Sequence, residues 1–186
     1  MNKRSMAVAV VAVLALAAGV TAQADEAAVP NGVFTMSVPA GYAGFTKQVQ
    51  TTQSPEGEIE VTNWISKAPT GEAVIVTMSR MPGTILDPQK LIAAMRDSLL
   101  KSLGATLESE EPRPGELTSS RLLFRSAAAW FRARFTVADD RVYQLLYVGR
   151  SAEQRDTPAV GAMFDSFQLT AAAAPAEAAA AAAVPK

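Results

Sequence analysis

The fold is decided by residues 116–149, which read ELTSSRLLFRSAAAWFRARFTVADDRVYQLLYVG. Apolar and polar residues alternate there in three stretches, 116–125, 130–137 and 141–149. A two-residue period is typical of half-buried β-strands. The links between the stretches are short, and Asp139-Asp140 forms a tight turn between the last two. Because strands joined by such short links pair antiparallel, these residues predict three strands of an antiparallel sheet.

The first half of the chain shows the same period. Residues 33–38 alternate, and residues 45–53 are β-prone but polar, which is typical of an edge strand. Residues 58–66 place Ile59, Val61, Asn63 and Ile65 on one face. A turn at Pro69-Thr-Gly71 leads into residues 73–79, so these last two strands are expected to form a hairpin.

Two helices interrupt the strands. Asp87 is an N-cap followed by Pro88 at the first helical position, and Gly104 ends a stripe of apolar residues with helical spacing. A second cap and proline, at Thr157-Pro158, predict a short helix to about Phe164. Phe167 and Leu169 are expected to dock the end of the domain. The order strands, helix, strands, helix predicts an α+β fold, with an antiparallel sheet of about six strands or more and helices packed on its faces.

The two ends differ from this domain, which spans residues 33–169. Residues 1–24 have a basic start, a short apolar run and alanines at positions 22 and 24, which together predict a signal peptide cleaved near Ala24-Asp25. Residues 25–32 form a polar lead-in, and residues 170–186 form a tail rich in alanine and proline that is expected to be disordered. The protein is therefore expected to be periplasmic or secreted, with no stable membrane anchor after cleavage.

Composition excludes several kinds of chemistry. The 186 residues include no cysteine and no histidine, so disulfides, Ser-His-Asp triads, cysteine nucleophiles and metal sites built on thiolate or imidazole are ruled out. We expect no catalytic residues, no metal and no cofactor. The net charge is −1 before cleavage and becomes more negative by two once Lys3 and Arg4 leave, so a nucleic-acid partner is not expected.

Two motifs were considered as sites and set aside. Ser98 and Lys101 match the S-x-x-K signature of penicillin-recognising enzymes, but they lie near the end of the helix on its polar side, and the partner motifs are missing. Five acids suggest calcium, but neither stretch has the glycine turn of a calcium loop. These acids, expected to be solvated, are Glu108, Glu110, Glu111, Asp139 and Asp140.

The candidate binding residues lie on two neighbouring strands. Alternation puts Arg121 and Arg125 on one side of the first strand, and Trp130, Arg132 and Arg134 on one side of the next. If the strands pair, these side chains share a face that offers guanidinium groups to an anion or a protein partner. The alternative is a solvated face whose arginines pair with acids of the sheet, for which we consider Glu58, Glu60 or Glu116.

A pocket is the other candidate site. Trp64, Tyr143 and Tyr147 would line an apolar space between sheet and helix, or else belong to the core. An enclosed apolar pocket would favour a small-ligand carrier, and an exposed patch of arginine and apolar side chains would favour a protein-binding module. A carboxylate with a raised pKa in a cleft would favour an enzyme.

Several segments resemble the Mog1/PsbP-like superfamily. They are the opening Phe34-Thr-Met-Ser-Val-Pro-Ala-Gly-Tyr42, the long capped helix after two hairpins, the last strand from Tyr143 to Gly149, and the ending Met163-Phe-Asp-Ser-Phe-Gln-Leu169. The resemblance covers roughly residues 33–169 and implies an antiparallel sheet layered with helices. It implies no catalytic residues, since members mostly act by binding other proteins. This chain lacks the lipid-bearing cysteine of the lipoprotein members.

The sequence thus predicts an exported, non-enzymatic module that binds an envelope protein or peptide. A small-ligand carrier with an apolar pocket between sheet and helix is the alternative, and the oligomeric state is left open.

Overall fold

The structure is a computed structural model, and it describes residues 33–54, 57–113 and 117–170. The expected signal peptide, the lead-in and nearly all of the alanine-rich tail lie outside these described residues. Within the described part of the chain, no helix is long and apolar enough to span a membrane.

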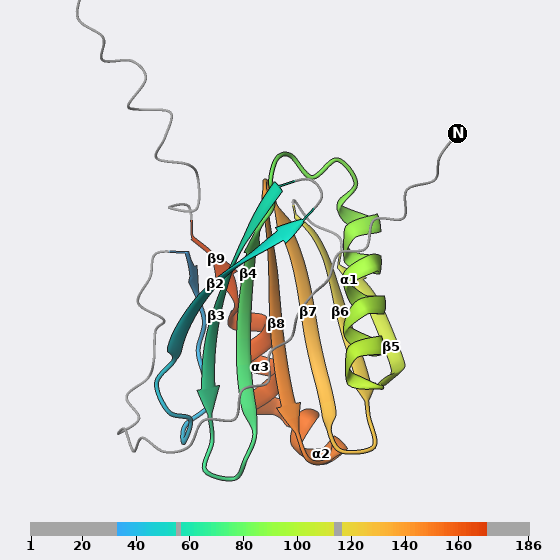
Figure 1. Ribbon diagram of the computed structural model, residues 1–186. Coiled ribbons are helices and arrows are strands. Elements are labelled where there is room, and N and C mark those ends of the chain that lie inside the picture. The colour runs from blue at the N-terminus through green and yellow to red at the C-terminus, as the bar shows by residue number, and fades with distance from the viewer. Residues whose placement is uncertain (1–32, 55–56, 114–116, 171–186) are drawn as a thin grey trace, which may run out of the picture.

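A seven-stranded sheet forms the body of the protein (Figure 1). Its spatial order is β2-β3-β4-β8-β7-β6-β5, and every neighbouring pair is antiparallel. The strands are β2 (Thr46–Ser54), β3 (Gly57–Lys67), β4 (Ala73–Arg80), β5 (Thr106–Arg113), β6 (Thr118–Arg125), β7 (Trp130–Ala138) and β8 (Arg141–Gly149). The α+β fold class, the hairpin of β3 and β4, and the polar edge strand β2 are therefore confirmed.

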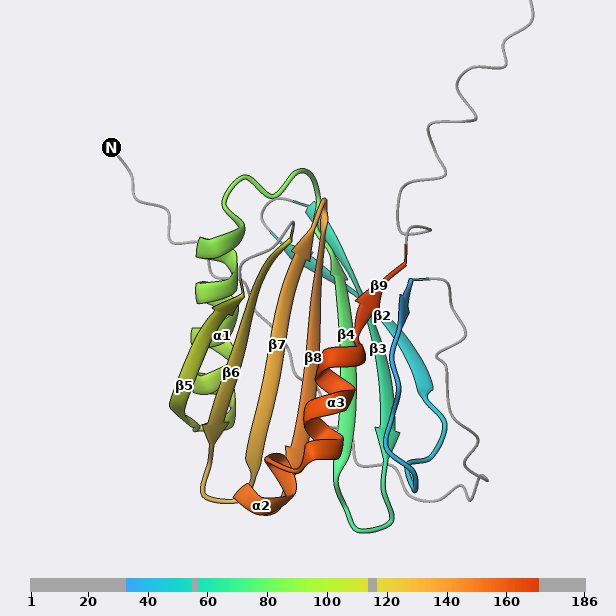
Figure 2. The same cartoon turned by 180° about the vertical axis from the view of Figure 1, so that it is seen from behind.

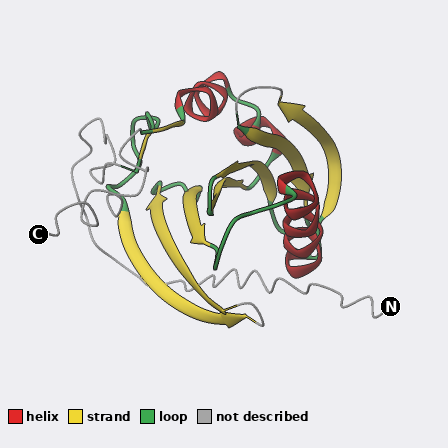
Figure 3. Ribbon diagram, turned by 90° about the horizontal axis from the view of Figure 1, so that it is seen from above, coloured by secondary structure: helices red, strands yellow, loops and turns green. Residues whose placement is uncertain are grey.

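Helices cover the two faces of the sheet unequally. Helix α1 (Pro88–Leu103) lies on one face, over the β6 and β7 half. Helices α2 (Ala152–Arg155) and α3 (Pro158–Ser166) lie on the opposite face (Figure 2). A small ribbon of β1 (Phe34–Thr35) and β9 (Gln168–Leu169) extends the layer that contains α3. Viewed from above, the sheet is curved, with α1 on the inner side of the curve (Figure 3).

Helix α1 begins and ends where its capping residues predict. The Oδ1 atom of Asp87 accepts a hydrogen bond from the Lys90 amide at 3.0 Å, which satisfies one of the free donors of the first turn. Gly104 ends the helix with φ at 56°, a left-handed conformation that costs glycine little. The second predicted cap is also confirmed, since the Thr157 hydroxyl accepts from the Val160 amide at 3.3 Å.

The sheet separates two hydrophobic cores. One packs α3 and the β1–β9 ribbon against β3, β4 and β8, and includes Phe34, Phe164 and Phe167. The other packs the apolar stripe of α1 against β6, β7 and β8, and includes Phe124 and Phe131, whose rings stack at 4.8 Å. Phe167 and Leu169 thus dock the end of the domain, as predicted.

Strand β5 is not predicted from the sequence, and strand β1 is shorter than predicted. Glu108, Glu110 and Glu111 are expected from the sequence to be solvated charges, but residues 106–113 form the outer edge strand next to β6. Acids and Pro112 suit an exposed edge because they discourage pairing with a further strand. Residues 33–38 were expected to be a strand throughout, yet only Phe34–Thr35 pairs, because its partner β9 is just two residues long.

Candidate functional site

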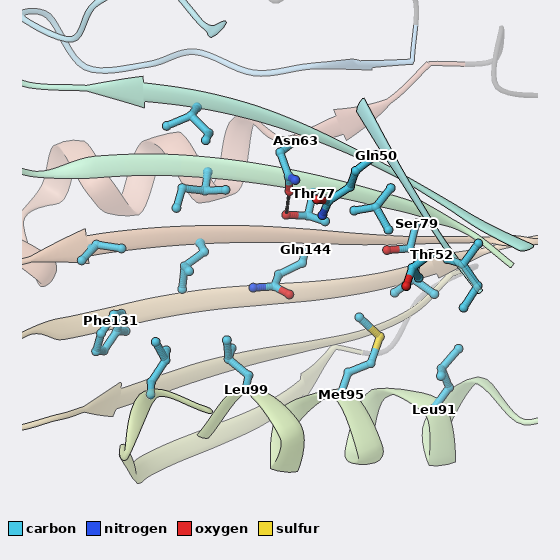
Figure 4. A pocket seen from close by; sticks show the side chains of 18 of the residues that line it. Gln50, Thr52, Asn63, Thr77, Ser79, Leu91, Met95, Leu99, Phe131 and Gln144 are labelled. Atoms are coloured by element: carbon cyan, nitrogen blue, oxygen red, sulfur yellow. Dashed lines mark hydrogen bonds between the residues drawn. The ribbon is translucent and has the colours of Figure 1, made fainter. Parts of the chain in front are cut away.

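A cavity of about 430 Å³ lies on the α1 side of the sheet. Its floor is formed by β3, β4 and β8, its far wall by α1, and its two ends by β2 and by the β6–β7 link (Figure 4). It exists because α1 packs on the β6–β7 half of the curved sheet and leaves the floor in front of β3 and β4 partly uncovered. The volume falls within the range of small-molecule sites, roughly 300–1,000 Å³.

The lining is mainly apolar and carries no charge. The helix contributes Leu91, Met95, Leu99 and Leu103, and the floor includes Ile59, Val61, Ile65, Ile75, Leu146 and Val148. Of the described residues that line the cavity, none is acidic or basic. An ionised group placed inside would lose its hydration without gaining a counter-charge, which is costly.

Three polar side chains cross this apolar floor in one row. Asn63, Thr77 and Gln144 are direct cross-strand neighbours on β3, β4 and β8. The Thr77 hydroxyl donates to Asn63 Oδ1 at 2.7 Å. Gln144 is only 6% exposed, and its side chain has no hydrogen-bond partner among the described residues. Figure 4 shows it projecting from β8 into the space in front of α1.

The cavity residues were not among the sequence-based candidates. Trp64, Tyr143 and Tyr147 instead point to the other face, where they are almost fully buried in the core under α3. The predicted pocket between sheet and helix is therefore present, but its predicted lining is wrong. The alternation of β8 held a usable signal, because Gln144 interrupts an otherwise apolar face.

The predicted arginine residues do share a face, and it is the face opposite the cavity. Arg121 pairs directly with Arg134 across β6 and β7, and Arg125 pairs with Trp130. Two guanidinium groups lie near the Trp130 ring, that of Arg125 at 5.4 Å and that of Arg155 at 5.2 Å from the ring centroid. We call Arg121, Arg125, Trp130, Arg132 and Arg134 the arginine face.

Arg134 and Arg121 connect the sheet to helix α3, which packs on the same face. Arg134 Nη1 donates to the carbonyl oxygens of Phe164 and Phe167, both at 3.3 Å, and its guanidinium lies 5.6 Å from the Phe167 ring. Burial lowers the pKa of Arg134 from its ordinary value. Arg121 is only 11% exposed and forms an ion pair with Asp165 of α3. The side chains therefore fasten α3 to the sheet.

The acids that pair with the arginine face are not those considered from the sequence. Glu108 of β5 pairs with Arg125 at 3.3 Å and also with Arg155. Glu58, by contrast, accepts a hydrogen bond from Gln53, and Glu116 lies outside the described residues. The reason is position in the sheet, since β3 lies far from β6 and β7 in the strand order whereas the unpredicted β5 is adjacent.

Arg132 differs from its neighbours. Its guanidinium lies 5.1 Å from the Phe164 ring, and within the described ranges it forms no ion pair. Burial lowers its pKa, and the nearby Arg121 lowers it further. Arg132 is thus a cation whose charge is incompletely balanced by direct contacts in the described residues.

Among the described residues, the carboxyl groups with shifted pKa values lie away from the cavity. The carboxyl groups with shifted pKa values, Glu153, Asp156 and Asp165, are all shifted below their usual values by hydrogen bonds, and none of them lines the cavity. In the part of the chain that the structure describes, no group of three or more acids is placed to hold a metal ion. Ser98 and Lys101 do not line the cavity either.

Comparison with known proteins yields a fold likeness of low sequence identity. No protein-family model matches the chain, and no curated protein matches it. Among solved structures, the chain is similar to the solution structure of cyanobacterial PsbP (CyanoP) from Synechocystis sp. PCC 6803, with 13% identity and a TM-score of 0.48. The match covers 78% of this chain and 98% of that one. Neither a family nor a function is carried over to this chain from that similarity.

Proposed function

We propose that this protein is a non-enzymatic binding protein that carries a small apolar ligand in the cavity between α1 and the sheet. The observation that supports this function best is the cavity itself, about 430 Å³ with a mainly apolar and uncharged lining. Such a lining favours binding by the hydrophobic effect, and the described lining residues include no acidic or basic side chain that could activate its serine and threonine hydroxyls. A small-ligand carrier is the alternative function expected from the sequence, and the cavity favours it over the protein-binding module.

A pair of matched substitutions tests the carrier. Val61 is half-buried on β3 and lines the cavity, whereas Val49 is 56% exposed on β2 and pairs with Thr62, which belongs to the other face. Tryptophan is well tolerated in strands, so Val61→Trp should fill the cavity and Val49→Trp should not. The ligand is N-phenylnaphthylamine, a neutral dye whose fluorescence rises in apolar sites.

The expected result is saturable dye binding at one site in the wild type and in Val49→Trp. Val61→Trp should weaken this binding at least about tenfold, which corresponds to about 1.4 kcal/mol. Circular dichroism should show that both variants keep the fold. If the wild type gives no saturable binding, or if Val61→Trp binds the dye as well as Val49→Trp does, the carrier function is wrong.

The second candidate function is a protein-binding or adaptor module that uses the arginine face. The observation that favours it is Arg132, which forms no ion pair within the described ranges, next to Arg125, whose side chain is 57% exposed. Together with Trp130 they present cations beside an aromatic ring, which suits an acidic segment of an envelope protein or peptide.

The adaptor is tested by charge reversal at two positions whose side chains donate no hydrogen bond to α3 within the described residues. Arg125→Glu with Arg132→Glu should abolish capture of a stoichiometric partner from envelope extract, and Lys47→Glu on distant β2 should not. Arg134 is left intact because it fastens α3. Equal capture by both variants would count against the arginine face.

We also propose that the protein is exported to the periplasm or the medium after cleavage of a signal peptide. It is supported by the signal-peptide pattern of residues 1–24 in the sequence. N-terminal sequencing of the protein recovered from the periplasm or medium should begin at Asp25. An uncleaved chain starting at Met1 in the cytoplasm would contradict it.

A further inference from the structure

Gln144 is the feature of the cavity that the hydrophobic effect does not explain. It lies on β8 between Val142 and Leu146 on the face that packs towards α1, and it is 6% exposed. A glutamine side chain offers two N–H donors and one carbonyl acceptor. The Gln144 side chain lines the cavity, so a ligand that fills the cavity and offers no partner would leave the amide buried and unpaired, which costs roughly 1–3 kcal/mol.

Among the residues that the structure describes, the Gln144 side chain has no hydrogen-bond partner. Its neighbour across the sheet on β4 is Thr77, whose hydroxyl already donates to Asn63. Its neighbour on β7 is Phe135, which has no polar side-chain atom. The wall that faces it across the cavity is made by Met95 and Leu99 of α1, which offer no strong hydrogen-bonding group (Figure 4).

The space in front of Gln144 is the cavity itself. A ligand that fills this cavity therefore covers the Gln144 amide as well, and a purely apolar ligand would remove any water that solvates it. A ligand with its own hydrogen-bonding group at this point would replace that water and keep the amide satisfied. A charged group is disfavoured there, because the described lining holds no counter-charge.

We propose that the cavity selects neutral amphipathic small molecules whose carbonyl or amide group pairs with the side chain of Gln144. This inference rests on the proposed carrier function and names the chemical class of its ligand. The apolar part of the ligand lies between the floor residues Ile75 and Leu146 and the α1 residues Met95 and Leu99. A primary amide is the best match, since one amide can donate to the carbonyl of Gln144 and accept from its NH₂ group.

Three ligands of nearly equal shape separate the effect of hydrogen bonding to Gln144 from the effects of apolar burial and of charge. They are para-butylbenzamide, its apolar isostere para-butylcumene and its charged analogue para-butylbenzoate. Their affinities are measured by displacement of N-phenylnaphthylamine from the purified protein. The test variant is Gln144→Leu, which keeps a similar volume but removes the hydrogen-bonding groups.

The matched control variant is Gln48→Leu. Gln48 lies on the same face of the sheet, opposite Asn63 on β2, but it is exposed and does not line the cavity. The two variants therefore make the same chemical change inside and outside the cavity. Dye binding by each variant, measured first, shows that the cavity is intact.

The quantity that decides is the affinity for the amide divided by the affinity for the cumene. We expect Gln144→Leu to lower this ratio about tenfold, by weakening the amide and strengthening the cumene, and Gln48→Leu to leave it unchanged. The wild type should bind the benzoate at neutral pH more weakly than the amide. Loss of dye binding in the wild type would refute the carrier function itself.

Two results would overturn the inference while leaving the carrier function in place. One is normal dye binding with a ratio that changes less than about twofold in Gln144→Leu, because a hydrogen bond in the site should change it more. The other is wild-type binding of the benzoate at neutral pH as tight as that of the amide, which would mean that the cavity accepts charge.

Discussion

Arg134 should stabilise the fold rather than bind a ligand, and Arg134→Met tests this. From the sequence, Arg134 is a candidate binding residue together with its neighbours on β6 and β7. In the structure its Nη1 atom donates to two carbonyl oxygens at the end of α3, those of Phe164 and Phe167. The Arg134 Nε atom also donates to the Ser119 hydroxyl of β6 at 3.3 Å. Methionine keeps much of the apolar side-chain length but removes all three hydrogen bonds and the charge.

The expected loss of stability follows from these contacts. Hydrogen bonds from a charged donor are worth about 1.5–3 kcal/mol, but these three are long, at 3.3 Å, and the side chain is only partly buried, so about 1 kcal/mol each is appropriate. The guanidinium also lies 5.6 Å from the Phe167 ring, which adds about 0.5 kcal/mol. Packing of the methionine returns part of this sum. The net loss should be about 3 kcal/mol, or roughly 9 °C in Tm.

Urea unfolding measures this loss, and Arg132→Met is its matched control. Arg132 lies on the same strand and the same face, and it stacks on Phe164 but donates no hydrogen bond to α3 within the described residues. It should lose less than about 1 kcal/mol, the value of a cation–π contact. Hydrogen exchange should also rise in α3 and β9 of Arg134→Met, while exchange in α1 on the opposite face stays low.

The reasoning would be refuted if Arg134→Met were no less stable than Arg132→Met. It would also be refuted if exchange increased equally in α1 and α3, because the lost contacts are confined to one face of the sheet.

Three further predictions use other parts of the structure. Asp87→Ala removes the N-cap of α1 and should cost about 1 kcal/mol in urea unfolding, whereas Asp87→Asn should cost much less. Arg121 holds the pKa of Asp165 below its usual value, so the pair stabilises the fold above about pH 4 and loses this contribution as the pH falls through the folded-state pKa. Asp165→Asn should therefore show a shallower loss of stability below about pH 4, and an acid limb as steep as that of the wild type would contradict the pairing. The affinity for para-butylbenzoate should rise as the pH falls through the pKa of the ligand, because only the neutral acid suits an uncharged cavity, and a flat pH profile would disagree.

Most of the secondary structure could be predicted because its signals are local. Alternation, β-prone composition and turn residues predicted six of the seven sheet strands, and Asp87 and Thr157 predicted the starts of both longer helices. Strand β5 was missed because its acids carry no apolar period. It forms because the edge of β6 is available, and Glu110 there accepts hydrogen bonds from Arg96 and Ser120. Such a strand depends on its neighbour rather than on its own sequence.

By itself, the sequence determined which residues share a face of each strand. It therefore placed the arginine face correctly, because period two is a property of the strand alone. Which face a helix covers was decided only in the tertiary structure. Helix α1 packs on one face of the sheet and covers only half of it, which leaves the cavity. This arrangement depends on strand order and sheet curvature, which arise from pairing between residues far apart in the sequence. For the same reason, Trp64 and Tyr143 became core residues while Gln144 came to face the cavity.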